Sequence, residues 1–257
     1  MRGMLYYELG EVEKSNRDIT DSLLIRPDSV RGVWMRGMVA AQEGRFADAI
    51  ADMEMLVRAD PSNADWLRQL AGYYQMDKRP RLAIQLLDKL VTADAENYKA
   101  LRSRGDAKLS VNLHQEAVED YEAAIKLMEA KRDKLEEDEF KDEYSGLLNN
   151  LAWVLATSPK DELRNGPHAL ELGLKACEAT DYKAPHILST LAAAYAETGD
   201  FENARKWAGK AVELGHEEKH EQVDQLQLEV DSYLQDKPWR EKQETEENEK
   251  PLVAPSD

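Results

Sequence analysis

The sequence has very little cysteine and no long hydrophobic run. Cys177 is the one cysteine among 257 residues, so no disulfide can form within the chain, which fits a reducing compartment. No apolar run approaches the roughly 18 to 20 residues that a membrane-spanning helix needs. The first residues, MRGMLYYELG, contain no apolar core of a signal peptide. These absences predict a cytoplasmic protein.

Basic residues are too few to balance the acidic ones. The chain has 34 lysine and arginine residues against 51 aspartate and glutamate residues, a formal net charge of −17 and a pI near 4.8. Such a charge repels phosphate backbones and does not favour anionic membranes, so we expect neither nucleic acid nor a membrane as a partner. A composition of 42% hydrophobic and 33% charged residues suits an elongated stack of thin layers better than one large core.

Motifs for catalysis and cofactor binding are also scarce. The sequence has no glycine-rich phosphate loop, no GxSxG and no carboxylate pair in an evident cleft, so we expect no cofactor and no enzymatic activity. His216, Glu217 and His220 do match the HExxH signature of zinc hydrolases, in which two histidines one helical turn apart bind the metal. Gly215 and charged flanks around this stretch favour a solvated linker, and a zinc hydrolase remains the remote alternative.

The sequence does contain a repeat of 34 residues. Pro27 aligns with Pro61 at that spacing, and the register continues to Ala95 and Glu129. Small residues recur at two places in each unit, namely Gly3, Gly37, Ala71 and Gly105 at the first place and Ser15, Ala49, Ala83 and Ala117 at the second. Two helices of about 12 to 14 residues with short turns fill about 34 residues, and small residues let them approach closely. The spacing therefore predicts stacked helix pairs.

Three stretches of the sequence resemble a known repeat family. They are RGMLYYELG, RGMVAAQEGRFADAI and STLAAAYAETGDFENARKWAGKAVELG, and they resemble the tetratricopeptide repeat (TPR). The resemblance implies an all-α fold, a right-handed α-α superhelix of about six helix-turn-helix repeats with a C-terminal capping helix. The units are expected at about 1–28, 29–62, 63–96, 97–130, 141–183 and 185–215. The last two also resemble C-terminal TPR regions of large bacterial multidomain proteins.

Three segments lie between or after these units. Residues 129–145 are rich in charge and lack glycine and proline, so we expect them to form a charged helical extension of the fourth unit. Residues 217–236 have apolar side chains at helical spacing, which predicts a capping helix. Residues 240–257 are charged and lack aromatics, which predicts a disordered acidic tail.

The first repeat begins part-way through its first helix. Met1 falls about six residues into the unit, which indicates either a chain cut from a longer protein or a neighbour that supplies the missing contact. The edge with Met1, Met4 and Leu5 is a candidate seam for self-association. A structural or oligomerisation module of a larger protein is therefore one functional alternative.

One pair of positions changes together within the chain. Units one, two and four have arginine just before the first small residue and aspartate sixteen residues later: Arg2 with Asp18, Arg36 with Asp52, and Arg104 with Asp120. The other three units have apolar residues at both positions. Because a half-buried charge without a partner is costly, this pattern predicts contact between the two helices of each pair.

The resemblance also implies a surface that holds a ligand. In the TPR family the first helices of successive pairs line a concave groove, and their outward positions touch a protein or peptide. The matching positions here include Tyr7, Arg31, Trp34, Met38, Arg68, Met76, Lys99, Arg102, Asp106 and Trp153. The expected function is therefore a non-catalytic scaffold for protein–protein interaction.

The groove positions include four cations in an otherwise acidic protein. Arg31, Arg68, Lys99 and Arg102 would form a basic stripe, which predicts a partner segment with acidic residues. The alternative is a solvated groove whose charges pair with neighbours. The chaperone-binding subset of the family needs asparagines and lysines where this chain has other residues, including Met35, so that mode of binding is not expected.

Overall fold

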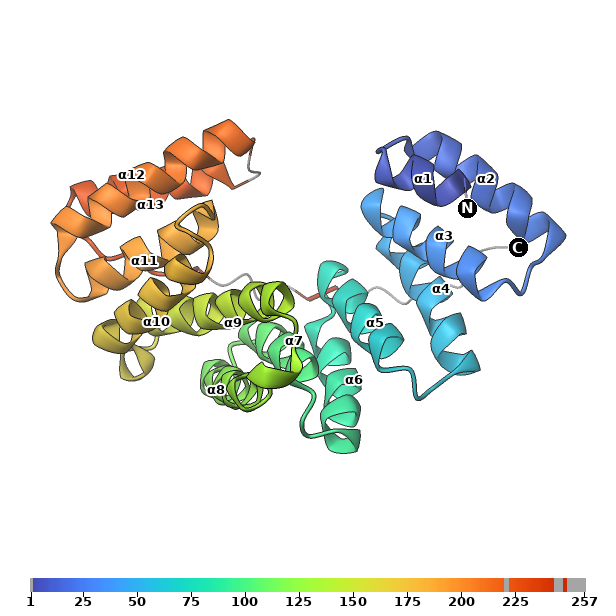
Figure 1. The fold of residues 1–257 in the computed structure, drawn as a ribbon, viewed down its shortest axis with the longest axis horizontal. Coiled ribbons are helices and arrows are strands. Elements are labelled where there is room, and N and C mark those ends of the chain that lie inside the picture. Colours follow the sequence, from blue (N-terminus) through green and yellow to red (C-terminus); the bar gives the residue numbers. More distant parts are fainter. Residues whose placement is uncertain (1, 220–221, 243–246, 249–257) are drawn as a thin grey trace. The chain divides into compact units, whose positions relative to one another are not determined.

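The computed structural model describes residues 2–219, 222–242 and 247–248, which form helices, turns and extended segments without any strand (Figure 1). The all-α prediction is therefore confirmed. Contacts between Cα atoms divide the chain into two compact units, residues 1–95 with 245–257, and residues 96–244. None of the helices within the described ranges is both long and apolar enough to cross a membrane.

The first unit consists of three helix pairs in which each helix packs against the next along the chain. Its helices are α1 (Arg2–Glu8), α2 (Val12–Ile25), α3 (Val30–Gln42), α4 (Phe46–Ala59), α5 (Ala64–Met76) and α6 (Pro80–Ala93). Ile50, Met53 and Leu56 of α4 are at most 2% exposed and form the centre of its core. At the α1–α2 crossing, the Ser15 hydroxyl donates a 2.9 Å hydrogen bond to the Gly3 carbonyl, so the small residues lie where the helices approach closely.

The ends of the helices repeat at the same spacing as the sequence. Ser29, Asn63 and Asn97 each accept a hydrogen bond at the start of a first helix, from the backbone N–H three residues later, at 3.0 to 3.2 Å. In the first four pairs, the first helix is followed by a left-handed residue: Gly10, Gly44, Lys78 or Asn112, with φ between 57° and 73°. The 34-residue register is therefore fixed by backbone geometry as well as by packing.

The second unit contains the remaining helices. They are α7 (Tyr98–Leu109), α8 (His114–Ala130), α9 (Glu137–Thr157), α10 (Gly166–Ala179), α11 (Pro185–Glu197), α12 (Phe201–Glu218) and α13 (Val223–Leu234), with 3₁₀ turns η1 (Arg132–Lys134) and η2 (Asp161–Leu163). Neighbours along the chain pack together, and α11 also packs against α9 and α13. The first helices of successive pairs therefore lie side by side on one face of the unit (Figure 1).

The structure corrects the prediction of one continuous helical extension over 129–145. Helix α8 ends at Ala130, the η1 turn follows, and α9 begins at Glu137. Helix α9 has 21 residues because the acidic segment adds turns to the first helix of the fifth unit. Glu137, Asp138 and Glu139 lie in its first turn, where the helix dipole favours negative charge.

The C-terminal predictions need two changes. Helix α12 continues to Glu218 and the capping helix α13 covers only Val223–Leu234 of the predicted 217–236. The tail predicted as disordered from 240 is in contact with the repeats at Arg240 and Glu241 and again at Glu247 and Asn248. The rest of that prediction, on residues 243–246 and 249–257, lies outside the described residues.

Candidate functional site

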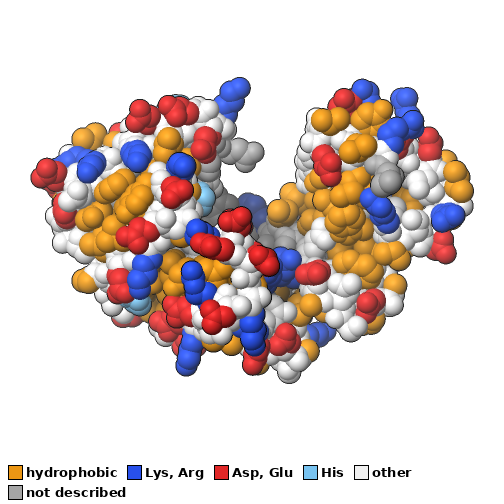
Figure 2. Space-filling model, in the orientation of Figure 1, with side chains coloured by type: hydrophobic (Ala, Val, Ile, Leu, Met, Phe, Trp, Pro, Cys, Tyr) orange, Lys and Arg blue, Asp and Glu red, His pale blue; other side chains and the backbone are white. Residues whose placement is uncertain are grey.

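The predicted surface of the first unit is mostly apolar. Trp34 and Tyr7 pack on its core, and the Trp34 indole N–H donates to the Gln69 side chain at 3.0 Å. Met38 is half-buried and Met76 is 59% exposed. Figure 2 shows hydrophobic side chains gathered over α1 and α3.

Two predicted cations of the first unit have weak contacts. Arg31 is exposed, and its Nη2 lies 3.3 Å from the Met4 sulfur. Arg68 is 40% exposed, with Nη2 3.6 Å from the Asp65 carboxylate. Both side chains are therefore at least partly accessible to solvent.

The two predicted cations of the second unit are instead paired. Lys99 Nζ lies 3.2 Å from Glu139 and 3.3 Å from Glu143, and Arg102 Nη1 lies 3.2 Å from Glu143. The carboxylates come from the added N-terminal turns of α9. Because these acids already balance Lys99 and Arg102, the predicted basic stripe does not extend along the second unit as unpaired charge.

The second unit contains a pocket of about 610 Å³. It lies where α7, α9, α11 and α13 converge, with Tyr121 of α8 at its base and the C-terminal segment along one side. Its lining residues are Asp106, Leu109, Ser110, Tyr121, Asn149, Asn150, Trp153, His186, Ser189, Thr190, Gln222, Gln225, Leu226, Glu229, Glu241 and Lys242. Polar side chains, three of them carboxyls, dominate this wall.

Asp106 is fixed in the pocket by neighbours from two helices. The Tyr121 hydroxyl donates to its Oδ1 at 2.6 Å, and the Asn150 side chain donates to the same oxygen at 2.9 Å. Burial raises the pKa of the Asp106 carboxyl, and these hydrogen bonds and the charge of Arg102 offset part of that increase. The orientation of the carboxyl is therefore fixed, and its neighbours offset only part of the cost of burying its charge.

Glu229 and Glu241 supply the other two carboxyls. Glu229 is 1% exposed and accepts hydrogen bonds from Ser189 at 2.5 Å and from Gln225 at 3.2 Å. Burial raises the pKa of Glu229 and of Glu241, and a hydrogen bond from Trp153 to Glu241 partly offsets the second increase. No ion pair involves any of the three carboxyls within residues 2–219, 222–242 and 247–248.

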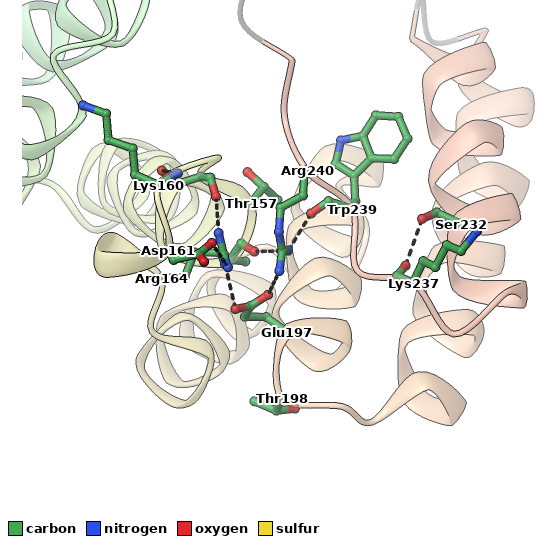
Figure 3. Close-up of polar contacts among 12 residues, drawn as sticks. Thr157, Lys160, Asp161, Arg164, Glu197, Thr198, Ser232, Lys237, Trp239 and Arg240 are labelled. Carbon is green, nitrogen blue, oxygen red and sulfur yellow. Dashed lines mark hydrogen bonds and ion pairs between the residues drawn. The ribbon is translucent and has the colours of Figure 1, made fainter.

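An extended stretch of the chain, residues 237–242, lies beside this pocket, and we call it the C-terminal strap. Figure 3 shows the Glu197 carboxylate between two guanidinium groups, with Arg164 Nε at 2.9 Å and Arg240 Nη2 of the strap at 2.6 Å. Arg240 also donates to the Ala156 carbonyl at 3.3 Å, and the Glu241 N–H donates to the Thr157 carbonyl at 3.0 Å. The repeats thus bind an extended backbone and a basic side chain of their own chain.

Trp239 anchors the start of the strap. Its indole packs on the cluster formed by Ala192, Ala196, Ala204, Ala208 and Tyr233. Small residues of α11 and α12 leave room for the large ring, which excludes water from the base of the strap. The strap is therefore held by an apolar contact and by an ion pair.

The sequence-based site overlaps the pocket in part. Asp106 and Trp153 line it, whereas Lys99 and Arg102 form ion pairs with α9. Glu229 was missed, although a carboxyl three residues after Leu226 and four before Tyr233 interrupts the apolar face of a helix. Nothing in the composition of the tail indicated a contribution from Glu241.

The HExxH stretch does not continue one helix. Helix α12 ends at Glu218, and Lys219 is left-handed with φ 54°, so the helix that holds His216 stops before position 220. His220 itself lies outside the described residues. Cys177 is buried, and burial raises the pKa of its thiol to about 12, which disfavours the reactive thiolate.

Comparison with curated proteins finds TPR-containing relatives. DnaJ homolog subfamily C member 3 of Rattus norvegicus is 28% identical over 137 residues, 47% of this chain and 27% of that protein. The TPR repeat-containing thioredoxin TDX of Arabidopsis thaliana is 28% identical over 100 residues, 39% of this chain and 26% of that protein. The matches therefore span about a quarter of each relative's length.

Solved structures share the fold. TTC0263, a thermophilic TPR protein in Thermus thermophilus, superimposes with a TM-score of 0.57 at 20% identity, over 80% of this chain and 100% of that one. PilW, a type IV pilus biogenesis factor, superimposes with a TM-score of 0.63 at 14% identity, over 88% of this chain and 94% of that one.

Family models of the tetratricopeptide repeat match residues 1–64 and 185–214. These ranges fall in different compact units: residues 1–64 span the first two helix pairs, and residues 185–214 lie in the pair α11–α12. Together with the TPR-containing relatives and the shared fold, they show that the chain contains tetratricopeptide repeats in both compact units.

Proposed function

We propose that the chain is a protein–protein interaction scaffold that holds a segment of another protein on its second unit. The segment would lie on the face formed by the first helices α7, α9 and α11 and by the capping helix α13, which we call the inner face. The TPR relatives and structural neighbours suggest a scaffold. The observation that carries the choice of surface is the C-terminal strap, in which Arg240 and Glu241 bind the ends of α9 and α11 as an extended segment.

The inner face offers what an extended segment needs. Extended backbone has unpaired N–H and C=O groups, and the C-terminal end of α9 supplies matching carbonyls. The Thr157 carbonyl accepts from the Glu241 N–H, and the Ala156 carbonyl accepts from the Arg240 side chain. Beside them lies the pocket, which remains open to solvent and is lined by rigid helices. A partner segment would continue along this face, with the pocket as the place for a side chain.

Matched pairs of substitutions test the inner face against the outer one. His186→Arg with Gln225→Arg puts bulky charge at two exposed positions that line the pocket. His168→Arg with Gln115→Arg makes the same changes on the second helices α10 and α8. Each variant of the full chain is immobilised, and proteins captured from the native lysate are quantified by mass spectrometry.

We expect the inner-face variant to lose specific partners that the outer-face variant keeps. Thermal unfolding monitored by circular dichroism checks that both variants are folded. Partners that depend equally on both faces, or on neither, would place the binding surface elsewhere and contradict the proposal.

A second candidate surface is the basic one of the first unit. Arg31 is exposed and the Arg68 side chain is 40% exposed, which supports binding of an acidic segment there. Arg31→Glu with Arg68→Glu should then abolish capture of acidic partners, whereas Arg17→Glu with Arg58→Glu, on second helices, should not. Equal capture by all three proteins would rule this surface out.

Self-association is the structural alternative. Leu5 and Leu9 are 58% and 71% exposed at the edge of the first repeat, which supports contact with another chain. Light scattering over a range of protein concentrations tests this, and Leu5→Ser with Leu9→Ser should lower the average mass. A mass that stays monomeric at all concentrations would remove this alternative.

A further inference from the structure

We propose that the pocket of the second unit binds the side chain of a lysine or arginine from an extended segment of a partner protein. This inference rests on the proposed function and names the chemistry of the partner. It differs from the acidic segment that the sequence predicts, because the pocket presents acceptors rather than cations.

Hydrogen-bond capacity supports a cationic donor. Tyr121 and Asn150 both donate to Oδ1 of Asp106, which leaves Oδ2 for a further donor. The side-chain oxygen of Asn149 is buried and has no partner among the described residues, and Asn149 lines the pocket. An ammonium group has three donors and a guanidinium group five, with no acceptor, so either group matches this surplus of acceptors.

The charges around the pocket also favour a cationic ligand. Asp106, Glu229 and Glu241 lie around one pocket without an ion pair to a described residue, and a buried carboxylate is stabilised strongly by an arriving cation. The basic residues of the lining are His186 and Lys242, and both side chains are exposed to solvent. Among the described residues, the charge of Arg102 acts on Asp106 from a distance, and no cation forms an ion pair with any of the three carboxyls.

The spacing of the carboxyls favours an organic cation over a metal ion. Within the described ranges no group of three His, Cys, Asp or Glu side chains is placed to hold a metal. A pocket of about 610 Å³ also has room for the long aliphatic stem of lysine or arginine. Trp153 forms part of the wall, and an indole face attracts such cations.

The strap provides a precedent on the same face. Arg240 is a basic side chain on an extended backbone, and it binds an acid, Glu197, together with the carbonyl of Ala156. The next residue, Glu241, lies in the pocket wall. The pocket repeats this combination of a carboxylate and nearby acceptors, and no basic side chain of the described residues forms an ion pair with its carboxylates.

The test uses fluorescein-labelled short alanine–serine peptides with one central residue: lysine, arginine, norleucine or glutamate. Fluorescence anisotropy measures their binding to the full chain. We expect the lysine and arginine peptides to bind about tenfold more tightly than the norleucine peptide, the size of one charge-assisted hydrogen bond. In the Asp106→Asn, Glu229→Gln variant this preference should fall close to one.

Two controls keep the test interpretable. Asp224→Asn removes the same charge from an exposed position of α13 and should keep the preference. Glu241→Gln changes the strap rather than a helix and should reduce the preference even if the double variant folds poorly.

Three outcomes overturn the inference. They are equal binding of lysine and norleucine peptides, a preference for cations that survives in the double variant, and no binding of any peptide. Any of these leaves the scaffold function to be judged by capture with the His186 and Gln225 variant, so the two proposals fail separately.

Discussion

The Arg104 guanidinium donates two hydrogen bonds to the Asp120 carboxylate, from Nε at 2.9 Å and from Nη2 at 2.6 Å. Lys108 Nζ lies 2.8 Å from the same carboxylate. Arg36–Asp52 and Arg2–Asp18 form the same two-pronged contact in their own units. The contact that the sequence pattern predicted is therefore confirmed in all three units.

Burial of the arginine decides how much each pair contributes to stability. The Arg104 side chain is 17% exposed, against 46% for Arg36 and 73% for Arg2. We expect Asp120→Leu to lower the free energy of unfolding by about 3–5 kcal/mol, because it removes the carboxylate that both Arg104 and Lys108 contact in a largely buried place. Arg104→Leu with Asp120→Leu should cost less than the two single changes added together, since other units have apolar pairs at these positions.

Urea unfolding of the four proteins in this double-mutant cycle gives the coupling energy. The same cycle at Arg36–Asp52 should give a smaller coupling, and at Arg2–Asp18 the smallest. Coupling energies that do not follow the order of burial would contradict the interpretation of these pairs as structural contacts.

Gly105 sets the distance between α7 and α8. A Cβ atom at this position would lie 2.7 Å from the Tyr121 ring, whereas a Cβ at Gly72 of α5 would meet nothing within 4 Å. Gly105→Ala should therefore destabilise the protein by about 1–3 kcal/mol through overpacking. Gly72→Ala, also within a helix, should stabilise it by about 0.5–1 kcal/mol because alanine loses less backbone entropy.

Thermal and urea unfolding measure both glycine variants. Because the Tyr121 hydroxyl orients Asp106, Gly105→Ala should also weaken binding of a lysine peptide to the pocket. Equal stability changes for the two alanine variants would show that the Gly105 contact is relieved at no cost.

The carboxyl of Glu229 should make stability depend on pH. Burial raises its pKa above the value of about 4.3 in the unfolded chain. The folded state then binds more protons between the two pKa values, so the free energy of unfolding falls as pH rises through that window. Ser189, Gln225 and Glu241 are the groups that influence this carboxyl in the folded state.

Glu229→Gln removes this titration. The stability of the variant relative to wild type should increase as pH rises above about 4.3 and level off above the raised pKa. Urea unfolding across that range measures the difference, with Asp224→Asn as the exposed control. A difference that stays constant with pH would mean that Glu229 titrates alike in both states.

Local sequence signals predicted the repeats well because their causes are local. Ser29, Asn63 and Asn97 cap helices, and Gly10 and Gly44 supply the left-handed turns. At Lys78 and Asn112 the same turn forms without glycine; asparagine adopts the left-handed conformation readily, whereas lysine does not.

Contacts between distant residues were not predictable in the same way. The acidic composition of 129–145 favoured one helix, yet the chain turns at η1 and its acids pair with Lys99 and Arg102 of α7. The composition of the tail favoured disorder, but Arg240 binds Glu197, which is 43 positions earlier in the chain. Such contacts depend on which surfaces the repeats bring together, and composition does not encode them.

Trp239 should control whether the C-terminal strap stays bound. Removing its indole takes away the apolar contact with the alanine cluster of α11 and α12, and leaves Arg240 as the main attachment. In Trp239→Ala we expect hydrogen exchange of the Glu241 amide, which donates to Thr157, to accelerate by about tenfold or more as the strap opens locally. Lys237→Ala changes an exposed side chain of the same segment and should leave this exchange rate unchanged. Opening of the strap also removes Glu241 from the pocket wall, so a lysine peptide should bind Trp239→Ala more weakly than wild type. Faster exchange together with unchanged peptide binding would separate the strap from the pocket and assign Glu241 a purely structural role.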